Sequence, residues 1–383
     1  MKVTNLTVHV LQVPLETPFA FSQGWVRQRS TVLVEIETDE GITGWGESLC
    51  HGLQPPEVAA AIIEHSLAPL VIGQDPFDVE VIWDKLFTFT RPYHGGAVIN
   101  AMSAVDIALW DIVGKAVNKP VHKLLGGAYR TEIMPYATGF YREETKQYPE
   151  AAIEEAQRHI EKGFRAMKLK TGFGMKVDVD YITAVRQAVG AEILLMADAN
   201  CAYNAATARR ILFELAEADA DLYWFEEPLD PEDIGGYKEL KGLTSTFIAS
   251  GENQFGPIGF RDWVANRALD VLQPDLCSSG GFTACKRIAV LASTWNTMLN
   301  PHVWGSGVGL AASLQYLATI PPARLALKPV EPMLEYDQSS HPFRSELIFD
   351  QISMNEQGMV KIPSQPGIGV EINRQVINKY KQN

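Results

Sequence analysis

The chain has 383 residues, of which 46% are hydrophobic and 21% charged, a balance that is typical of a folded globular protein and excludes a disordered one. Its net charge of −13 disfavours nucleic acid and anionic membrane surfaces as partners, because their phosphates would repel it. No uninterrupted apolar run reaches the roughly 18 residues that span a bilayer, and the N-terminus alternates like a strand, without the apolar core of a signal peptide.

Residues 1–125 have the pattern of an α+β module. Two stretches alternate like strands, Val3–Val10 and Thr31–Thr38, and a turn over residues 39–44 follows the second. From residue 56 to residue 125, apolar residues recur instead at helical spacing, until Leu124-Leu-Gly-Gly interrupts the pattern. We therefore expect a mixed domain in which strands are followed by helices.

Residues 131–340 have a different pattern, in which short apolar runs alternate with amphipathic helices. This alternation is typical of βα units and a parallel sheet, and eight runs predict an α/β fold with a TIM-type barrel. The runs are Ile133–Ala137, Ala166–Leu169, Ile193–Ala197, Leu222–Phe225, Thr246–Ala249, Val271–Gln273, Met298–Asn300 and Leu325–Val330. Beyond residue 340 the pattern is irregular, and we expect this tail, residues 341–383, to pack back on the N-terminal module.

An ionisable residue follows each of six consecutive apolar runs. These residues are Lys170, Asp198, Glu226, Glu252, Asp275 and His302, each 23 to 28 residues after the one before, which is about one βα unit. Because the carboxyl ends of barrel strands meet at one mouth, we expect the six side chains to converge there. A single charged residue often only marks the end of a strand, but six in register favour a catalytic site.

Three of these residues are carboxylates on neighbouring strands, namely Asp198, Glu226 and Glu252. Three buried carboxylates repel one another unless a counter-charge lies between them. Ligands that are all oxygen atoms favour a hard divalent cation, Mg²⁺ first and Mn²⁺ second, whereas Zn²⁺ prefers histidine or cysteine. The alternative is a network of ion pairs with arginines.

Two lysines are the first candidates for a base beside the carboxylates. Lys168 and Lys170 are two residues apart on a predicted strand, so they point to one face. We expect the two ammonium groups, helped by the nearby metal ion, to lower each other's pKa. A lysine tuned in this way can act as a general base. A solvated surface pair is the alternative for a lone Lys-X-Lys.

Asp275 and His302 fall on neighbouring predicted strands. An aspartate that accepts from one imidazole nitrogen fixes the tautomer and makes the other nitrogen more basic. His302 would then face the substrate from the side opposite Lys170, although a purely structural histidine–aspartate pair has the same pattern. Glu335, after the eighth run, can add a further acid or hydrogen bond.

Six motifs, in this order along the chain, resemble the enolase superfamily and, within it, the mandelate racemase/muconate lactonizing subgroup. They are Lys168-Leu-Lys170, Asp198-Ala-Asn200, Phe225-Glu226-Glu227-Pro228, Gly251-Glu252-Asn253, Gln273-Pro-Asp275 and Pro301-His302-Val-Trp-Gly. The resemblance covers nearly the whole chain. It implies a modified (β/α)7β barrel over residues 131–340, under an α+β capping domain made of residues 1–125 and the tail.

The resemblance also implies roles for the site residues and for partners. It implies that Asp198, Glu226 and Glu252 bind Mg²⁺, and that Lys170 and the His302–Asp275 dyad are the two bases. It further implies that Glu335 supports the carboxylate of the substrate, and that the protein is a homo-oligomer. The scattered cysteines (Cys50, Cys201, Cys277 and Cys285) are typical of free thiols in the cytoplasm.

Within the subgroup, the chain looks like the galactarolactone cycloisomerases. We therefore expect abstraction of the proton alpha to the carboxylate of an acid sugar or its lactone, followed by β-elimination. An acid-sugar dehydratase and a racemase or epimerase share the first step and remain open, and a non-catalytic sugar-acid binding protein is the alternative from another class. Asn200, Trp25, His51 and Tyr141 are the predicted contacts with this small carboxylate substrate.

Overall fold

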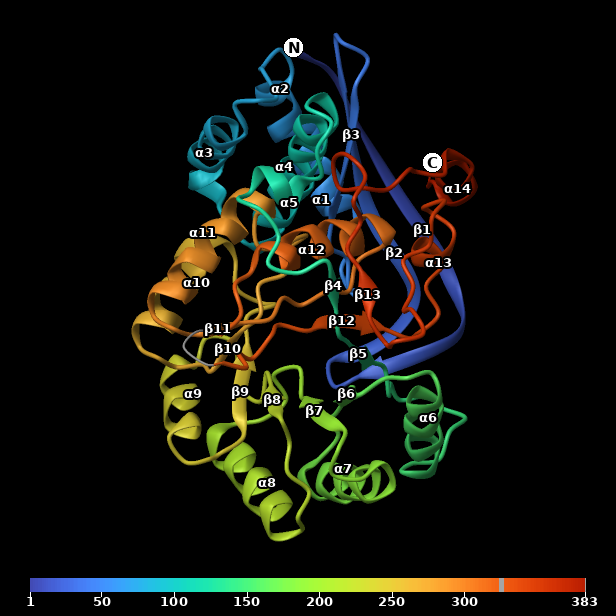
Figure 1. Ribbon diagram of the computed structural model, residues 1–383, viewed down its shortest axis with the longest axis vertical. Coiled ribbons are helices and arrows are strands. Elements are labelled where there is room, and N and C mark those ends of the chain that lie inside the picture. Colours follow the sequence, from blue (N-terminus) through green and yellow to red (C-terminus); the bar gives the residue numbers. More distant parts are fainter. Residues whose placement is uncertain (324–326, 383) are drawn as a thin grey trace.

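The computed structural model describes residues 1–323 and 327–382 of the protein. Figure 1 shows two parts along the long axis: the N-terminal elements gather at the top, and a barrel with its surrounding helices lies below them. The C-terminal segment, drawn in red, passes from the barrel back to the top, so that α14 lies beside β1.

The N-terminal module contains one antiparallel sheet and a group of helices. The strands are β1 (Val3–Phe21), β2 (Gly24–Thr38) and β3 (Thr43–Ser48), in that order in the sheet. The helical segments are α1 (Glu57–Ile62), a π-helical turn (Ile63–Leu67), α2 (Ala68–Val71), α3 (Val79–Thr90), a 3-10 turn (Arg91–Tyr93), α4 (Gly96–Ala116) and α5 (Val121–Leu124). Helix α4 packs directly on β3, because a Cβ atom at Gly46 would lie 1.9 Å from the carbonyl oxygen of Ala104.

Helix α4 is long and apolar enough to cross a membrane by length and composition, yet 78% of its most apolar window is buried inside the protein. Two acidic residues interrupt its apolar sequence and tie it to its neighbours. Asp106 accepts a hydrogen bond from the backbone N–H of Thr283 (3.0 Å), and Asp111 accepts from those of Trp45 (2.9 Å) and Ile368 (2.8 Å). Helix α4 is therefore the central core helix of the capping module.

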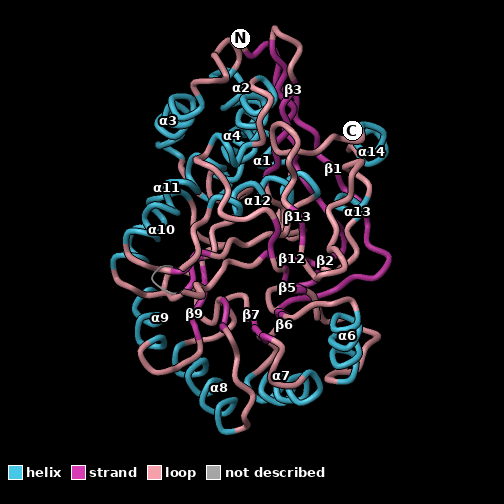
Figure 2. The backbone as a smooth tube through the Cα atoms, viewed as in Figure 1, coloured by secondary structure: helices cyan, strands magenta, loops and turns pink. Residues whose placement is uncertain are grey.

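The barrel contains eight parallel strands and seven helices within the described residues, which confirms the predicted (β/α)7β fold. Its strands are β5 (Pro135–Thr138), β6 (Ala166–Lys170), β7 (Leu194–Asp198), β8 (Trp224–Glu226), β9 (Phe247–Ser250), β10 (Val271–Leu272), β11 (Met298–Leu299) and β12 (Leu334–Asp337). Its helices are α6 (Glu150–Glu161), α7 (Met175–Val189), α8 (Ala205–Glu217), α9 (Ile234–Lys241), α10 (Gly256–Ala265), α11 (Gly281–Thr294) and α12 (Gly307–Thr319). Figure 2 shows these helices around the strands.

The eighth strand does not lie where the sequence pattern placed it. Residues 325 and 326 of the predicted strand lie outside the described residues, and residues 327–330 are not in a strand. The eighth strand is β12 instead, so Glu335 lies on the strand itself. Pro329 and Pro332 explain the error, because proline has no N–H to donate to a sheet and the apolar residues around it cannot form a central strand.

Two side chains connect the first and last strands of the barrel sheet, whose order is β11-β10-β9-β8-β7-β6-β5-β12. No ladder joins β11 to β12 within the described part of the chain. The Asn300 side-chain oxygen accepts a hydrogen bond from the backbone N–H of Met333 (2.7 Å), and Glu335 accepts from that of Val303 (3.0 Å). These two bonds span the gap beside the mouth of the barrel.

The tail contains α13 (Pro342–Ser345), β13 (Val360–Lys361) and α14 (Arg374–Tyr380). Strand β13 pairs with the short strand β4 (Glu132–Ile133), which contains the first residue of the first predicted run. Beyond α14, the backbone N–H of Gln382 donates to the carbonyl oxygen of Val10 (3.0 Å). The tail thus contacts both the start of the barrel and the N-terminal sheet, and the predicted domain boundaries remain predictions.

Candidate active site

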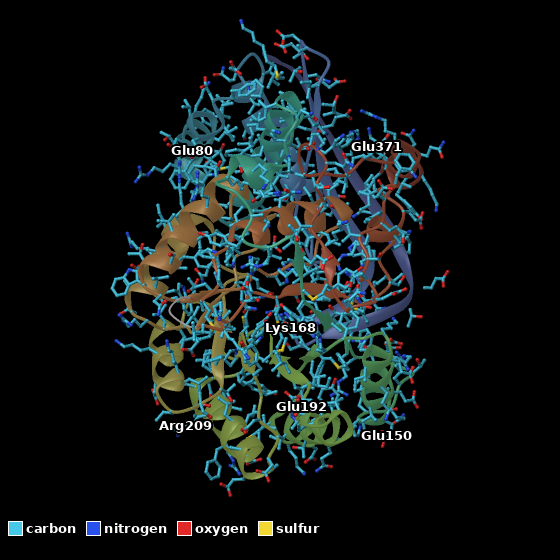
Figure 3. All side chains as sticks on the ribbon, in the orientation of Figure 1. Glu80, Glu150, Lys168, Glu192, Arg209 and Glu371 are labelled. Atoms are coloured by element: carbon cyan, nitrogen blue, oxygen red, sulfur yellow. The ribbon has the colours of Figure 1, made fainter. Side chains whose placement is uncertain are left out.

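The charged side chains of β6, β7 and β8 lie side by side because of the strand register. Lys170 pairs with Asp198, and Asp198 pairs with Glu226. Glu252 follows the end of β9, which is the next strand in the sheet. Figure 3 shows Lys168 near the centre of the molecule, whereas the other labelled residues lie toward its edge. The structure therefore brings the predicted residues together at one end of the barrel.

Asp198, Glu226 and Glu252, here called the acidic trio, each offer an oxygen atom, and these buried atoms lie within 4.8 Å of one another. Lysines supply the nearby positive charge. The Lys168 ammonium contacts Glu226 and lies 3.7 Å from Asp198 Oδ2, and the Lys170 ammonium lies 2.5 Å from the same oxygen. No arginine forms an ion pair with the trio within the described residues, so the alternative of an arginine network does not hold.

Negative charge exceeds positive charge in this buried region. Six carboxyl groups (Asp198, Glu226, Glu227, Glu252, Asp275 and Glu335) face three cationic groups (Lys168, Lys170 and His302), and all nine are buried. Burial raises the pKa of Glu226 to about 7, and the carboxylates around it act in the same direction although Lys168 opposes them. Oxygen donors with excess negative charge suit a hard divalent cation, so the acidic trio fits an ion of this kind.

The pKa values of Lys168 and Lys170 are raised in this structure, whereas the prediction of lowered values included the charge of a nearby metal ion and stays a prediction. Burial does disfavour the charged form of Lys170, and Lys168 adds to that effect, but Asp198 and Glu252 together outweigh both and raise the pKa of Lys170. Glu226 and Glu335 likewise raise the pKa of Lys168 well above its ordinary value, against burial. The ammonium–ammonium repulsion is weaker than the attraction to carboxylates at hydrogen-bond distance. A divalent cation on the acidic trio would compete for those carboxylates and weaken this effect.

His302 and Asp275 form the predicted pair. Asp275 Oδ2 lies 2.7 Å from His302 Nδ1, and on the other side of the ring Nε2 lies 3.2 Å from Glu252 Oε2. Burial opposes the charge on His302, but Glu252, Glu335 and Asp275 raise its pKa to about 10. Nε2 therefore points toward the acidic trio, and the aspartate holds the ring in that orientation.

Glu335 is held by three donors. Its Oε1 accepts from the Thr138 hydroxyl (2.8 Å) and lies 2.7 Å from the Lys168 ammonium, and its Oε2 accepts from the backbone N–H of Val303. Burial favours the neutral acid, but Lys168 and His302 hold the pKa of Glu335 well below its usual range. Glu335 is therefore an ionised carboxylate in a fixed position between β12 and the loop that carries His302.

Aromatic rings surround the ammonium group of Lys170. The ring centroids of Phe21, Tyr141 and Trp304 each lie 5.8 Å from Lys170 Nζ, and Trp304 stacks on Tyr141 at 5.9 Å. Tyr141, one of the predicted substrate contacts, is thus part of this aromatic wall. Phe21 comes from the tip of the β1–β2 hairpin, so the capping module helps to enclose Lys170.

A cavity of about 280 Å³ opens between the capping loops and the acidic trio. It is lined by Phe21, Gln23, His51, Leu53, Gln54, Asn200, Glu252 and Asn253. Two predicted substrate contacts, Asn200 and His51, lie in it, and burial lowers the pKa of His51 to about 4. Trp25 is half-buried on β2 opposite Ala20 and does not line this cavity, so its predicted contact with the substrate remains a prediction.

Trp304, Gln23 and Leu53 were missed as individual site residues. Trp304 follows His302 by two positions in a motif that is recognised only as a whole, and this spacing was the available signal. Gln23 and Leu53 lie in capping loops without periodicity, and nothing in the sequence pattern distinguishes them from surface residues. Glu227, which follows a trio member directly, accepts both hydrogen bonds of the Asn253 amide (3.0 Å each) behind the trio.

A buried carboxylate joins the capping module to the loop that carries His302. Glu47 of β3 accepts hydrogen bonds from the hydroxyls of Thr31 and Ser306 (2.7 Å each) and from the backbone N–H groups of Ser306 and Gly309. Ser306 and Gly309 lie at the start of α12, directly after the loop that carries His302, whereas Thr31 belongs to β2 of the capping sheet. The position of this loop therefore depends on the capping sheet.

The fold and the site define an acid–base enzyme on a barrel with a carboxylate site for a divalent cation. Residues 4–126 match the family described as "Mandelate racemase / muconate lactonizing enzyme, N-terminal domain", and residues 151–376 match "Enolase C-terminal domain-like". The chain therefore belongs to the mandelate racemase/muconate lactonizing enzyme family of the enolase superfamily, which confirms the predicted resemblance.

Three relatives show which members of the superfamily the chain is similar to. It is 39% identical, over 100% of its length and 99% of the relative's, to the D-galactarolactone cycloisomerase of Agrobacterium fabrum (strain C58 / ATCC 33970). The crystal structure of the 3,6-anhydro-D-galactonate cycloisomerase from Zobellia galactanivorans superposes with a TM-score of 0.89 at 33% identity, covering 100% of both chains. A racemase from Streptomyces coelicolor A3(2), solved with bound magnesium, gives 0.88 at 27% identity over 99% and 100% of the two chains.

Proposed function

We propose that the protein abstracts the proton alpha to the carboxylate of an acid sugar or its lactone and then completes a β-elimination, as a cycloisomerase of the galactarolactone type. The observation that carries this proposal is the placing of two bases of different chemistry, Lys170 and His302, around one buried acidic trio. The relationship to two sugar-acid cycloisomerases supports the substrate class.

Mg²⁺ is the cation we propose for Asp198, Glu226 and Glu252. Its chemistry when bound is to hold the substrate carboxylate and to offset the negative charge that develops as the alpha proton leaves. The all-oxygen donor set and the excess of buried negative charge support Mg²⁺ over softer ions, and Mn²⁺ shares the same preference for oxygen. The related racemase solved with bound magnesium also supports this choice.

Each residue has a part in proton transfer that follows from its position. Lys170 and His302 take or return the alpha proton, each from its own side of the substrate. Asp275 keeps His302 Nε2 toward the reacting carbon, because it lies on the other ring nitrogen. Glu335, with Thr138 and the backbone N–H of Val303, holds its carboxylate in place beside Lys168.

Elimination needs a second proton transfer. When one base has removed the alpha proton, the protonated group on the other side can donate a proton to the leaving oxygen. In a lactone this oxygen belongs to the ring, so the ring opens. Exclusion of water by Phe21, Tyr141 and Trp304 would protect the charged intermediate from side reactions.

The deciding experiment is proton NMR in D₂O with Mg²⁺ and a panel of aldarates, aldonates and aldarolactones. Conversion of a lactone to an open-chain acid supports the cycloisomerase. A 2-keto-3-deoxy product from an open-chain acid would replace it with a dehydratase, and exchange without net conversion would replace it with an epimerase. Absence of exchange with the whole panel would overturn the acid-sugar substrate class. The Glu226→Gln variant, which should be inactive, serves as the negative control.

We also propose that the protein forms a homo-oligomer in the cytoplasm. Exposed apolar side chains on α3 support an interface on the capping module, since Val81 is 66% and Phe89 51% exposed. The four free cysteines support a reducing compartment. Light scattering coupled to size-exclusion chromatography tests the assembly, and a monomer at micromolar concentration would contradict it.

A further inference from the structure

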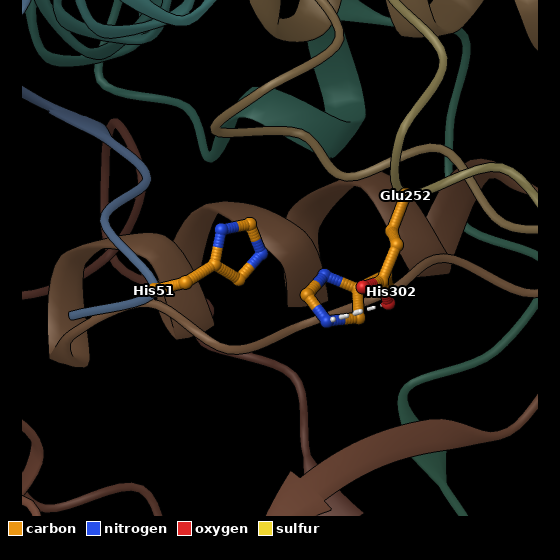
Figure 4. Close-up of side chains that lie close together, drawn as sticks. All are labelled: His51, Glu252 and His302. Carbon is orange, nitrogen blue, oxygen red and sulfur yellow. Dashed lines mark ion pairs between the residues drawn. The ribbon is translucent and has the colours of Figure 1, made fainter. Parts of the chain in front are cut away.

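Three side chains form a second group of possible cation ligands beside the acidic trio. His51, Glu252 and His302 each offer one ligand atom, and these atoms lie within 4.8 Å of one another. They come from the capping loop after β3, the end of β9 and the loop after β11. Figure 4 shows the two imidazole rings close together, with the Glu252 carboxylate beside His302. The ring centroids lie 6.0 Å apart.

The two oxygens of Glu252 point to different neighbours. Oε1 accepts a weak hydrogen bond from the Asn200 amide (3.4 Å), whereas Oε2 lies 3.2 Å from His302 Nε2 and has no hydrogen-bond partner among the described residues. One carboxylate can therefore serve two cations, as in many two-metal sites.

His51 Nε2 is a second buried atom without a partner in the described part of the chain. Its loop is held in place, because the His51 backbone N–H donates to the Gln54 side chain (3.0 Å), and that side chain donates to the carbonyl oxygen of Leu49. A buried polar atom that is left unpaired destabilises the fold by about 1–3 kcal/mol, and a ligand that pairs with it removes this penalty.

His302 already has the surroundings of a metal-binding histidine. Asp275 lies on Nδ1 at 2.7 Å and so directs Nε2 toward Glu252. Metal-ligating histidines in proteins commonly have a carboxylate on the other ring nitrogen, which orients the ring and makes it a stronger ligand. The group therefore consists of one oriented imidazole, one imidazole without a hydrogen-bond partner at Nε2, and one carboxylate oxygen whose neighbour is the oriented imidazole itself.

This donor set selects a different kind of ion from the acidic trio. Two imidazoles and one carboxylate suit Zn²⁺ and its neighbours Co²⁺ and Ni²⁺, whereas Mg²⁺ prefers oxygen ligands. Zn–N bonds of about 2.0–2.1 Å place the ligand atoms of a tetrahedral ion about 3.4 Å apart. The three groups must therefore close by about an ångström around the ion, which rotation of the His51 side chain on its loop can supply.

We propose that His51, His302 and Glu252 form a second, inhibitory site for a transition-metal cation, with Zn²⁺ as the preferred occupant. The ion would occupy the cavity next to the Mg²⁺ site and withdraw His302 from proton transfer. Only the inhibition rests on the proposed function, since binding of the ion does not require turnover.

The test uses Co²⁺ as a spectroscopic substitute for Zn²⁺, added to the full-length protein in excess Mg²⁺. The wild type should bind one Co²⁺ per chain, with the visible absorption of nitrogen-ligated cobalt, and Zn²⁺ should abolish this absorption. His51→Gln should weaken binding of Co²⁺ and Zn²⁺ at least about tenfold. Glu226→Gln should keep the cobalt signal, because it damages only the acidic trio. Exposed His65 supplies the matched control, since His65→Gln should bind like the wild type.

Two results would overturn the proposal. One is unchanged Co²⁺ and Zn²⁺ affinity in His51→Gln, which would show that His51 is not a ligand. The other is loss of the cobalt signal in Glu226→Gln, which would place the ion in the acidic trio. Retained Mg²⁺ binding in His51→Gln shows that this variant is folded. With an active substrate, half-inhibition by Zn²⁺ should need at least about tenfold more Zn²⁺ in His51→Gln. A protein that binds cobalt as expected but exchanges no alpha proton would contradict the proposed function and leave this site in place.

Discussion

The mouth of the barrel and the capping loops above it contribute to the same cavity, but they are built in different ways. At the mouth, the strand register places Lys170, Asp198 and Glu226 side by side, and every charged group has a fixed partner. The capping loops supply Gln23, His51 and Leu53, none of which is fixed by a regular element. We infer that the mouth determines the reaction type, whereas the capping loops determine which substrate enters.

The largest loss of activity is expected from a substitution at the mouth of the barrel. Glu226→Gln should lower turnover by about 10⁴-fold or more, because the cation provides several kcal/mol of transition-state stabilisation. Calorimetry should also show loss of Mg²⁺ affinity. The exposed Glu192 offers a matched control, and Glu192→Gln should behave like the wild type. Normal Mg²⁺ affinity in Glu226→Gln would show that the acidic trio is not the metal site.

Substitution of either of the two proposed bases should cause the second-largest loss of turnover. Lys170→Ala and His302→Asn should each lower turnover by about 10²- to 10⁴-fold, the usual range for a general acid or base. In D₂O, each variant should lose exchange from one side of the substrate and keep some on the other. Lys176, which is 82% exposed, provides the control Lys176→Ala. Full activity in both base variants would contradict the two-base assignment.

The connection between the two regions can be tested through Glu47. Glu47→Ala leaves buried donors of Thr31 and Ser306 unpaired, so we expect the free energy of unfolding to fall by about 3 kcal/mol. Chemical denaturation measures this value, with the exposed Glu64→Ala as the control. An unchanged free energy of unfolding would mean that the cap does not hold the His302 loop.

Proton affinity at His302 should respond to the metal. The carboxylates around it, Glu252 first, raise its pKa to about 10 against burial, so a cation on Glu252 should lower this pKa. Histidine NMR with and without Mg²⁺ measures the change, which we expect to be at least about tenfold in proton affinity. A pKa that stays near 10 at saturating Mg²⁺ would show that the cation does not offset the Glu252 charge.

The smallest effect is expected in the capping loops. Leu53→Ala removes part of an apolar side chain from the cavity wall and should raise KM by about three- to tenfold, with little change in kcat. Leu243, exposed on the barrel, supplies the control Leu243→Ala. A large loss of kcat in Leu53→Ala would break the division, because a capping residue would then contribute to the chemistry.

Periodicity explains why the mouth could be predicted from the sequence. Charged residues recurring every 23 to 28 positions mark the ends of successive βα units, so their spacing alone is enough to assign Lys170, Asp198 and Glu226 to one site. The eighth strand was misplaced because the apolar residues before β12 outweighed Pro329 and Pro332, which a central strand does not accommodate. The raised lysine pKa values depend on distances to carboxylates, which a sequence does not contain.

The capping loops could not be predicted to the same extent. Gln23 and Leu53 follow no repeat, and their approach to the cavity depends on how the hairpin and the β3 loop lie over the barrel. Trp25 and Phe21 are both aromatic residues of the same hairpin, but only Phe21 reaches the aromatic wall. Neighbouring residues of a hairpin point to opposite faces, and the sequence alone did not show which face is the inner one.

The Glu47 carboxylate limits how such a protein can be recombined with its relatives. A loop exchange confined to residues 49–56 would leave its hydrogen bonds to Ser306 and Gly309 intact. Replacement of the whole N-terminal module by one without a carboxylate at position 47 would leave the Ser306 hydroxyl and the Gly309 backbone N–H without their acceptor, next to the loop that carries His302. The two halves are therefore not interchangeable parts: new selectivity can be introduced through short loops, whereas whole-cap chimeras require the acceptor and its donors to be transferred together.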